Sequence, residues 1–395
     1  MMILVFWVMA LSLFALATWA GQRLGLIPIV SQLLLATFGL PLLMLLWIEP
    51  HWQLSGAQLV SPIWLKSLYG LAFAVVLGQI LSEVIDVKLD RQSLKIAVPS
   101  FFVPFLAGIA CAIWLLPEQV WISSLAVGLV FAITAIPVLY LYLHHIDYPP
   151  AATRRLVQTA ILIDLTCWSL FALAQGSLHL GSLHLGSLLL PLLSACVPLL
   201  FRLLRLRQPL LYSLTFFALL MVAEHYRLNA LIFGIGYLVC MARLGQAWVP
   251  PLNATTLRFI QNRLAIPLLL TFGIVQIDVH AALNETGWLQ LAALIVLPIA
   301  SKLLGNWIGL HWATPSFTGA SRWRESVLLN IRGLSEIVFL NLLLQQQLIS
   351  PALYFALMLM GLIATLMPAF TGMGRLPSRA TPSIEPPKRN TCAHH

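Results

Sequence analysis

The stretch Val157-Gln-Thr-Ala-Ile-Leu-Ile-Asp-Leu-Thr-Cys-Trp168 decides how the rest of the chain is organised. It carries one carboxylate, Asp164, near the middle of an apolar run that can cross a bilayer, which takes about 20 residues. A charged group at that depth costs roughly 2.5–3.5 kcal/mol on the mildest insertion scale, and such groups mark ion or substrate pathways. Asp164 is therefore the first candidate for an ion-binding residue. A structural aspartate, hydrogen-bonded or paired within the protein, is the alternative.

The preceding apolar run contains the sequence Ala132-Ile-Thr-Ala-Ile-Pro137. Proline lacks the amide hydrogen of a helical bond, so the sequence predicts an unwound segment at Ala135, Ile136 and Pro137. Irregular backbone at membrane depth is tolerated only where protein or water covers it. The hydroxyl of Thr134 lies beside the carbonyls that the break frees, so it is a candidate cation ligand, with helix capping as the alternative.

The composition excludes a soluble protein. Of the 395 residues, 60% are hydrophobic and only 9% are charged, with a mean hydropathy of +0.92, whereas soluble domains carry about 25% charged residues. We expect an all-α polytopic membrane protein that contacts membrane lipid. The net charge of +9 does not indicate nucleic acid, because basic residues accumulate in the cytoplasmic loops of membrane proteins.

No motif indicates catalysis. The five cysteines lack the spacing of a disulfide framework or a metal site, and no nucleophile, phosphate-loop or dinucleotide motif occurs. We therefore expect neither an enzyme nor a cofactor or bound metal. A Gly-Ser-Leu-His-Leu repeat at 176–187 contains His179 and His184, and a tolerated loop duplication is favoured over metal binding there.

The apolar runs predict about 13 transmembrane helices. The expected spans are 2–20, 28–47, 60–84, 94–116, 121–143, 152–174, 187–204, 209–224, 228–244, 264–280, 287–311, 323–346 and 350–372. Most of the 22 basic residues then fall in odd-numbered loops and in the tail at 373–395, which predicts an external N-terminus and a cytoplasmic C-terminus. The tail is rich in proline and polar residues, so we expect it to be disordered.

A second interruption is predicted in span twelve, within Leu328-Leu-Asn-Ile-Arg-Gly-Leu-Ser-Glu-Ile-Val338, at Asn330 and Gly333. Spans five and twelve are seven apart, so they cross the membrane in opposite directions. Broken helices at matching positions of two inverted halves are the best sequence indication of a transporter site. We expect inverted repeats at 28–174 and 228–372, joined by connecting helices at 187–224, within one membrane domain at 1–372. Two unrelated kinked helices are the alternative.

Three more charges lie inside spans. Lys302 is too deep in span eleven to reach water easily, and a buried amine needs a counter-charge. Asp164 is its expected partner, either for transport or as a structural ion pair. Arg332 and Glu336 are four residues apart on one helix face. We expect this pair to stabilise the broken helix, with direct ion handling as the alternative.

Together these residues resemble the sodium/proton exchanger domain of the monovalent cation:proton antiporter-2 family. The similarity extends over nearly all of residues 20–372. The matching segments are Gly21–Val30, Phe38–Pro41, Glu83–Lys88, Thr134–Pro137, Ile163-Asp164 with Trp168, Ser301–Gly305 around Lys302, and Asn330–Glu336.

The resemblance implies a core domain with two crossed unwound helices beside a dimerisation domain, and an elevator movement of the core. It implies that Asp164 binds the cation or the proton, and that Lys302 is the family's buried lysine. One position departs from the family: Ile163 replaces the first member of an acidic or Asn-Asp pair. We therefore expect, at best, electroneutral exchange of Na+, K+ or Li+ for H+ by a homodimer in a prokaryotic inner membrane. The alternatives are a sodium-coupled symporter of organic anions and a non-transporting scaffold or sensor.

Overall fold

The computed structural model describes residues 2–24, 28–83, 90–115, 121–178, 194, 196–206, 208–225, 230–245, 254–276 and 287–371. Every regular element in these ranges is a helix. Five segments are long and apolar enough to cross a membrane by length and composition: Met2–Arg23, Pro28–Trp52, Arg91–Trp114, Trp288–Ala313 and Pro351–Pro368. The chain is thus an all-helical, multi-pass membrane protein. His179, His184, residues 84–89 and the predicted tail lie outside the described ranges.

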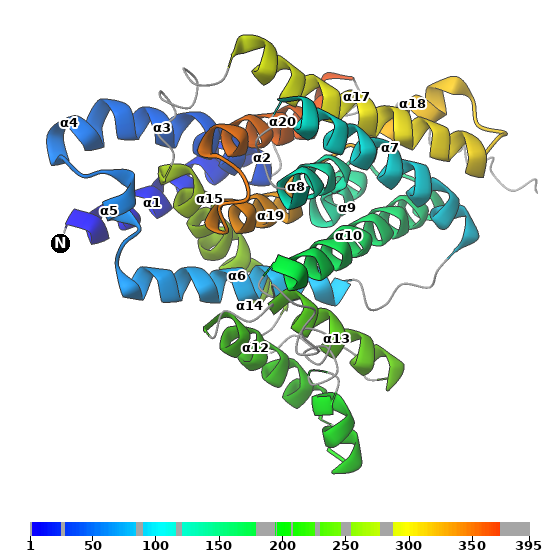
Figure 1. Cartoon of the computed structure of the whole chain (residues 1–395), viewed down its shortest axis with the longest axis horizontal. Helices are drawn as coiled ribbons and strands as arrows, with labels where there is room; N and C mark the ends of the chain where they lie inside the picture. Colours follow the sequence, from blue (N-terminus) through cyan, green and yellow to red (C-terminus); the bar gives the residue numbers. More distant parts are fainter. Residues whose placement is uncertain are drawn as a thin grey trace, which may run out of the picture.

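In Figure 1, helices α1, α3, α4 and α5 of the N-terminal part lie at the left of the molecule, while α6 runs from there beneath its middle. The bounds of the helices in this part are α1 Met2–Arg23, α2 Pro28–Leu34, η1 Leu35–Gly39, α3 Leu40–Leu43, η2 Met44–Ile48, α4 Glu49–Trp52, α5 Gly56–Leu59 and α6 Ile63–Glu83. The short pieces from α2 to α4 follow one another without a loop, so they form a single irregular helix across 28–52.

Three turns of π-helix have a common cause in the sequence. Each is followed two residues later by a proline: Pro41 after η1, Pro50 after η2, and Pro267 after η3 (Gln261–Ala265). Proline cannot donate to the carbonyl four residues earlier and its ring clashes with that carbonyl. A wider turn with bonds to the fifth residue relieves both problems and lets the helix continue.

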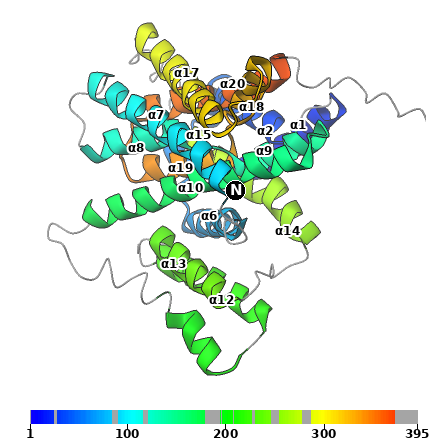
Figure 2. The ribbon, with the colours of Figure 1, turned by 90° about the vertical axis from the view of Figure 1, so that its right-hand side faces the viewer.

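The remaining helices build the site and its surroundings. They are α7 Arg91–Leu115, α8 Trp121–Ala132, α9 Ile136–His145, α10 Pro150–Leu178, α12 Pro209–His225, α13 Ala230–Arg243, α14 Ala254–Ile260, α15 Ile266–Val275, α17 Trp288–Ala313, α18 Gly319–Leu328, α19 Leu334–Gln345 and α20 Pro351–Phe370. Both ribbon views place α12 and α13 at one side, below α6 (Figures 1 and 2). In Figure 1, α8, α9, α10 and α19 lie together in the middle.

The helices α7 and α17 are packed backbone to backbone, side by side in both views. A Cβ atom on Gly305 would lie 2.6 Å from the carbonyl oxygen of Pro99, and one on Gly309 would lie 2.6 Å from that of Ile96. Small residues four apart allow this close approach of helices in membranes. The contact brings Lys302 of α17 against the middle of α7.

Three basic loop regions meet at one end of the bundle. The hydroxyl of Ser93, at the start of α7, donates to the carbonyl of Arg155 at the start of α10 over 3.4 Å. Arg155 in turn forms an ion pair with Glu325 of α18. Residues of α7, α10 and α18 thus lie together at this end of the bundle.

The tenth predicted span, 264–280, differs from the structure. Helix already begins at Ala254 and runs through α14, η3 and α15 to Val275. The basic residues Arg258 and Arg263 thus lie in the helix rather than in a loop. The apolar run marks only the part that hydrocarbon covers, and a helix can extend beyond it into the polar interface.

Candidate ion-binding site

Two interrupted helices meet at the centre of the fold. Residues 133–135 separate α8 from α9, and residues 329–333 separate α18 from α19. The predicted unwound segment at residues 135–137 is wrong in part: Ile136 and Pro137 begin α9, because proline is tolerated in the first turn of a helix. The amide of Ala135 donates to the carbonyl of Ile331 over 3.2 Å, so the two breaks are bonded to each other directly. A Cβ atom on Gly333 would lie 2.7 Å from Cγ2 of Val138, and this close approach explains the glycine.

Two cations replace the helical bonds that α8 loses at its end. In a continuous helix the carbonyls of residues 130–132 would accept from amides four residues later. Here the Arg332 guanidinium donates to the carbonyls of Val130 and Phe131, the second over 2.7 Å, and the Lys302 ammonium donates to that of Ala132. Positive charge at the carboxyl end of a helix is also favoured by the helix dipole.

Lys302 has a second acceptor that proline creates. Pro104 of α7 has no amide hydrogen, so the carbonyl of Ser100, four residues earlier, loses its helical bond. The Lys302 ammonium donates to this carbonyl over 3.2 Å. The expected partner, Asp164, lies at the same interruption, but these two hydrogen bonds of the lysine go to backbone carbonyls. Sequence reasoning missed these acceptors, although Pro104 in an apolar run was the available signal.

Asp164 binds a backbone amide at the same break. Its Oδ1 accepts from the amide of Thr134 over 3.0 Å, and the residue is fully buried. The carboxylate therefore faces the interruption from α10, two residues along the backbone from the carbonyl that Lys302 binds. The structure thus brings the predicted residues Asp164, Thr134 and Lys302 together around the first break.

Several buried oxygens at the breaks are available to a ligand. Among the described residues, no hydrogen-bond partner is found for Oγ1 of Thr134, Oδ1 of Asn330 or Oγ of Ser335. All three side chains are at most 1% exposed. Buried polar atoms are almost always bonded to protein, water or an ion. Oxygens at an unwound segment are the ligands that transporters offer to Na+ or H+.

The second break is fixed by Arg332, Glu336 and Thr365. The Arg332 guanidinium donates to Oε1 of Glu336 over 3.2 Å, as the spacing of four residues predicts. The Arg332 carbonyl, freed by the break, accepts from the hydroxyl of Thr365 on α20 over 2.7 Å. A Cβ atom on Gly361 would lie 2.7 Å from Oε2 of Glu336, so α20 leaves room for the carboxylate. Thr365 was not predicted, because an isolated threonine in an apolar run carries no distinguishing signal.

The charges of the site balance. Asp164, Lys302, Arg332 and Glu336 are each at most 2% exposed. Their formal charges cancel when all four are ionised, which is the arrangement that a low-dielectric interior tolerates best. Ile163, beside Asp164, is buried and adds no charge or hydrogen-bonding group. Binding of one proton or one monovalent cation therefore raises the charge of the site by one in either case.

A separate ion pair joins the start of α10 to the last turn of α18. Nη2 of Arg155 contacts both oxygens of Glu325, at 2.6 and 2.8 Å, and the Tyr148 hydroxyl donates to Oε1 over 3.4 Å. Burial and the neighbouring Glu325 raise the pKa of Tyr148 to about 12, so its hydroxyl remains a donor. This pair was not predicted, because its two members lie 170 residues apart in the chain.

The arrangement offers oxygen ligands and one exchangeable carboxylate. No three His, Cys, Asp or Glu side chains gather as a metal ion would need, within the part of the chain that the structure describes. Lys302 and Arg332 bind the backbone beside Asp164, and Glu336 binds the Arg332 side chain.

Comparison with known proteins identifies a solved structure with a similar fold. No protein-family profile matches the chain, and no curated protein matches its sequence. The structure is similar to that of the sodium proton antiporter MjNhaP1 from Methanocaldococcus jannaschii, with a TM-score of 0.60 over 95% of this chain and 98% of that chain. The sequences are 14% identical, so the similarity is one of fold.

Proposed function

We propose that the protein is a secondary transporter that exchanges a monovalent cation, Na+, K+ or Li+, for H+. The observation that carries the proposal is the buried carboxylate of Asp164, hydrogen-bonded to the backbone of an interrupted helix at Thr134. The solved structure with the same fold is described as a sodium proton antiporter, which supports the same reaction class. Asp164 binds the ion or the proton, and Thr134 adds an oxygen ligand.

The exchange is electroneutral in this proposal. With Lys302, Arg332 and Glu336 remaining charged, the site has the same net charge when Asp164 holds a proton as when it holds a monovalent cation. The core domain therefore carries the same net charge across the membrane whether Asp164 holds the proton or the cation. Ile163 supports this stoichiometry, because it supplies no second carboxylate at the site.

The proposal also includes the repeats, the two domains and the orientation of the protein in the membrane. Residues 28–174 and 228–372 form inverted repeats, and the core with the two unwound helices moves as an elevator against a dimerisation domain. The protein is a homodimer in the inner membrane, with its N-terminus outside and its C-terminus in the cytoplasm. The basic regions beside α7, α10 and α18 mark the cytoplasmic side.

Everted membrane vesicles test the proposal. Vesicles acidified by respiration receive Na+, K+ or Li+ while a fluorescent dye reports lumenal pH. We expect at least one cation to raise the lumenal pH in the wild type and to have no effect in Asp164→Asn. The matched control is Glu49→Gln, an equal loss of charge at an exposed position of α4, which should behave as the wild type.

The wild type should respond to at least one cation at some pH between about 6 and 9. If it responds to none of the three in that range, exchange is refuted. Transport that persists in Asp164→Asn would refute the assigned carboxylate instead.

A further inference from the structure

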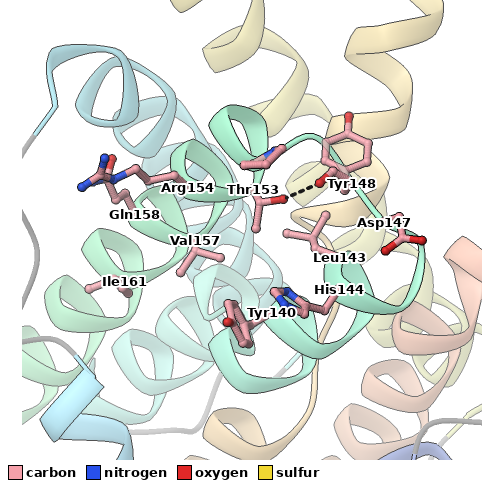
Figure 3. Close-up of a pocket in the computed structure, with 11 residues that line it drawn as sticks. Tyr140, Leu143, His144, Asp147, Tyr148, Thr153, Arg154, Val157, Gln158 and Ile161 are labelled. Carbon is pink, nitrogen blue, oxygen red and sulfur yellow. Dashed lines mark hydrogen bonds between the residues drawn. The ribbon is translucent and has the colours of Figure 1, made fainter. Parts of the chain in front are cut away.

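A cavity of about 610 Å3 lies between the end of α9 and the start of α10, away from the carboxylate site. The turn that joins the two helices closes one side, where the Thr153 hydroxyl donates to the carbonyl of Tyr148 over 3.3 Å (Figure 3). The volume is within the range of sites that hold small molecules, roughly 300–1,000 Å3. Its walls belong to the second half of the first interrupted helix and to the helix that carries Asp164.

The lining changes from polar to apolar along α10. Arg154, Val157, Gln158 and Ile161 recur every three or four residues, so they share one face of the helix. Arg154, at the start of α10, is exposed, and Ile161, two turns further on, is buried. On the α9 side, His144 is exposed and Leu143 is buried (Figure 3). A ligand that fits has a polar head at the rim and an apolar part beneath it.

The charge of the surroundings indicates the sign of the head. Arg154 lies at the rim, and the guanidinium of Arg324 lies 5.4 Å from the ring of Tyr148, which also lines the cavity. The acid Asp147 lies at the opposite end from Arg154 (Figure 3). Basic loops face the cytoplasm, where the membrane leaflet carries anionic lipids and basic pockets between helices bind their head groups.

We infer that this cavity binds an anionic phospholipid of the cytoplasmic leaflet. Arg154 pairs with the lipid phosphate, and His144 donates a hydrogen bond to the head group. The first part of an acyl chain lies along Val157, Ile161 and Leu143. The bound lipid touches α9 and α10 together, so it connects the interrupted helix to the helix of Asp164. The inference rests on the proposed orientation in the membrane but not on cation exchange, because lipid binding is measured without transport.

Thermal unfolding of the purified protein in a neutral detergent measures the binding. Phosphatidylglycerol is titrated against phosphatidylcholine with the same acyl chains, and glycerol 3-phosphate supplies the phosphate without a lipid. We expect only phosphatidylglycerol to raise the unfolding temperature of the wild type with saturation. In Arg154→Gln its apparent affinity should fall by about fivefold, the usual effect of one basic residue near a membrane surface.

Two more variants make the test specific. Val157→Phe fills the apolar part of the cavity and keeps the rim charge, so it should also weaken phosphatidylglycerol binding. Arg23→Gln removes an exposed arginine at the end of α1, outside the cavity, and should bind as the wild type does. Equal effects of the two lipids on the wild type, or equal losses in Arg154→Gln and Arg23→Gln, would overturn the inference. Saturable binding of glycerol 3-phosphate as strong as that of the lipid would overturn it too.

Discussion

The amide of Thr134 donates a 3.0 Å hydrogen bond to Oδ1 of Asp164, while the Thr134 hydroxyl has no hydrogen-bond partner among the described residues. The main chain of this threonine therefore fixes the carboxylate, and its side chain remains available to an ion. The two roles can be separated by mutation, because a substitution at residue 134 keeps the amide.

Thr134→Ala should weaken cation binding without abolishing exchange. The variant lacks one oxygen that binds the charged cation. Its apparent Michaelis constant for the cation should therefore rise by about tenfold, with little change in maximal rate. Proteoliposomes with a lumenal pH dye measure both quantities. Thr37→Ala is the matched control, since its hydroxyl is equally buried and has no described partner either. A normal Michaelis constant in Thr134→Ala would exclude the hydroxyl as a ligand.

Lys302→Leu should destabilise the fold, whatever its effect on transport. The substitution leaves the carbonyls of Ser100 and Ala132 buried without this donor, and each such loss costs about 1–3 kcal/mol. We expect a clearly lower unfolding temperature in detergent. Lys66→Leu, at an exposed position of α6, makes the same chemical change and should alter stability by less than about 0.5 kcal/mol. Equal stability of the two variants would mean that the lysine does not support the carbonyls.

Gly305→Ala tests the contact of α7 with α17. The added methyl group would lie 2.6 Å from the Pro99 carbonyl oxygen, so the two helices must separate. Overpacking of this kind costs about 1–3 kcal/mol. Gly287→Ala, at the start of α17, is the control, because its Cβ atom would meet only Gln290 Oε1 at 3.9 Å. Thermal unfolding of the two variants should therefore differ, with Gly305→Ala the less stable.

Much of the architecture follows from the sequence for physical reasons. An unbroken apolar run in a chain with few charges can only be a buried or membrane helix, so the all-helical membrane class was predictable. Pro137 predicted a break in its apolar run at residues 135–137, and the break lies at residues 133–135, slightly earlier in the chain. The number of spans, the inverted repeats and the two domains stay predictions, because pattern and charge alone support them.

The partners of the buried charges were harder to predict. A lysine buried in an apolar run needs a hydrogen-bond acceptor or a counter-charge. The sequence shows which acids could serve, but it does not show which backbone carbonyls lack a helical hydrogen bond. The carbonyls that Lys302 and Arg332 bind are free to accept because Pro104 removes one helical donor within α7 and because α8 ends at Ala132. The assigned roles of Asp164, Thr134, Lys302, Arg332 and Glu336 in transport likewise stay predictions until they are measured.

The pair of Arg155 and Glu325 should prove energetically coupled. Arg155 contacts both carboxylate oxygens, its guanidinium lies 5.0 Å from the ring of Phe317, and Glu325 is only 2% exposed. Removing one partner of a buried pair leaves an uncompensated charge and costs about 3–5 kcal/mol. Arg155→Gln and Glu325→Gln should therefore each lower the unfolding temperature, and the double variant should lose less than the sum of the two.

A double-mutant cycle measures this coupling, which should lie between about 0.5 and 3 kcal/mol. The control cycle joins Glu325→Gln with Arg91→Gln, an exposed arginine at the start of α7 on the same side of the membrane, and should be additive. Additivity in both cycles would show that the contact adds nothing to stability. Coupling in the first cycle alone would establish that this pair holds α10, the helix of Asp164, against α18 in the folded protein.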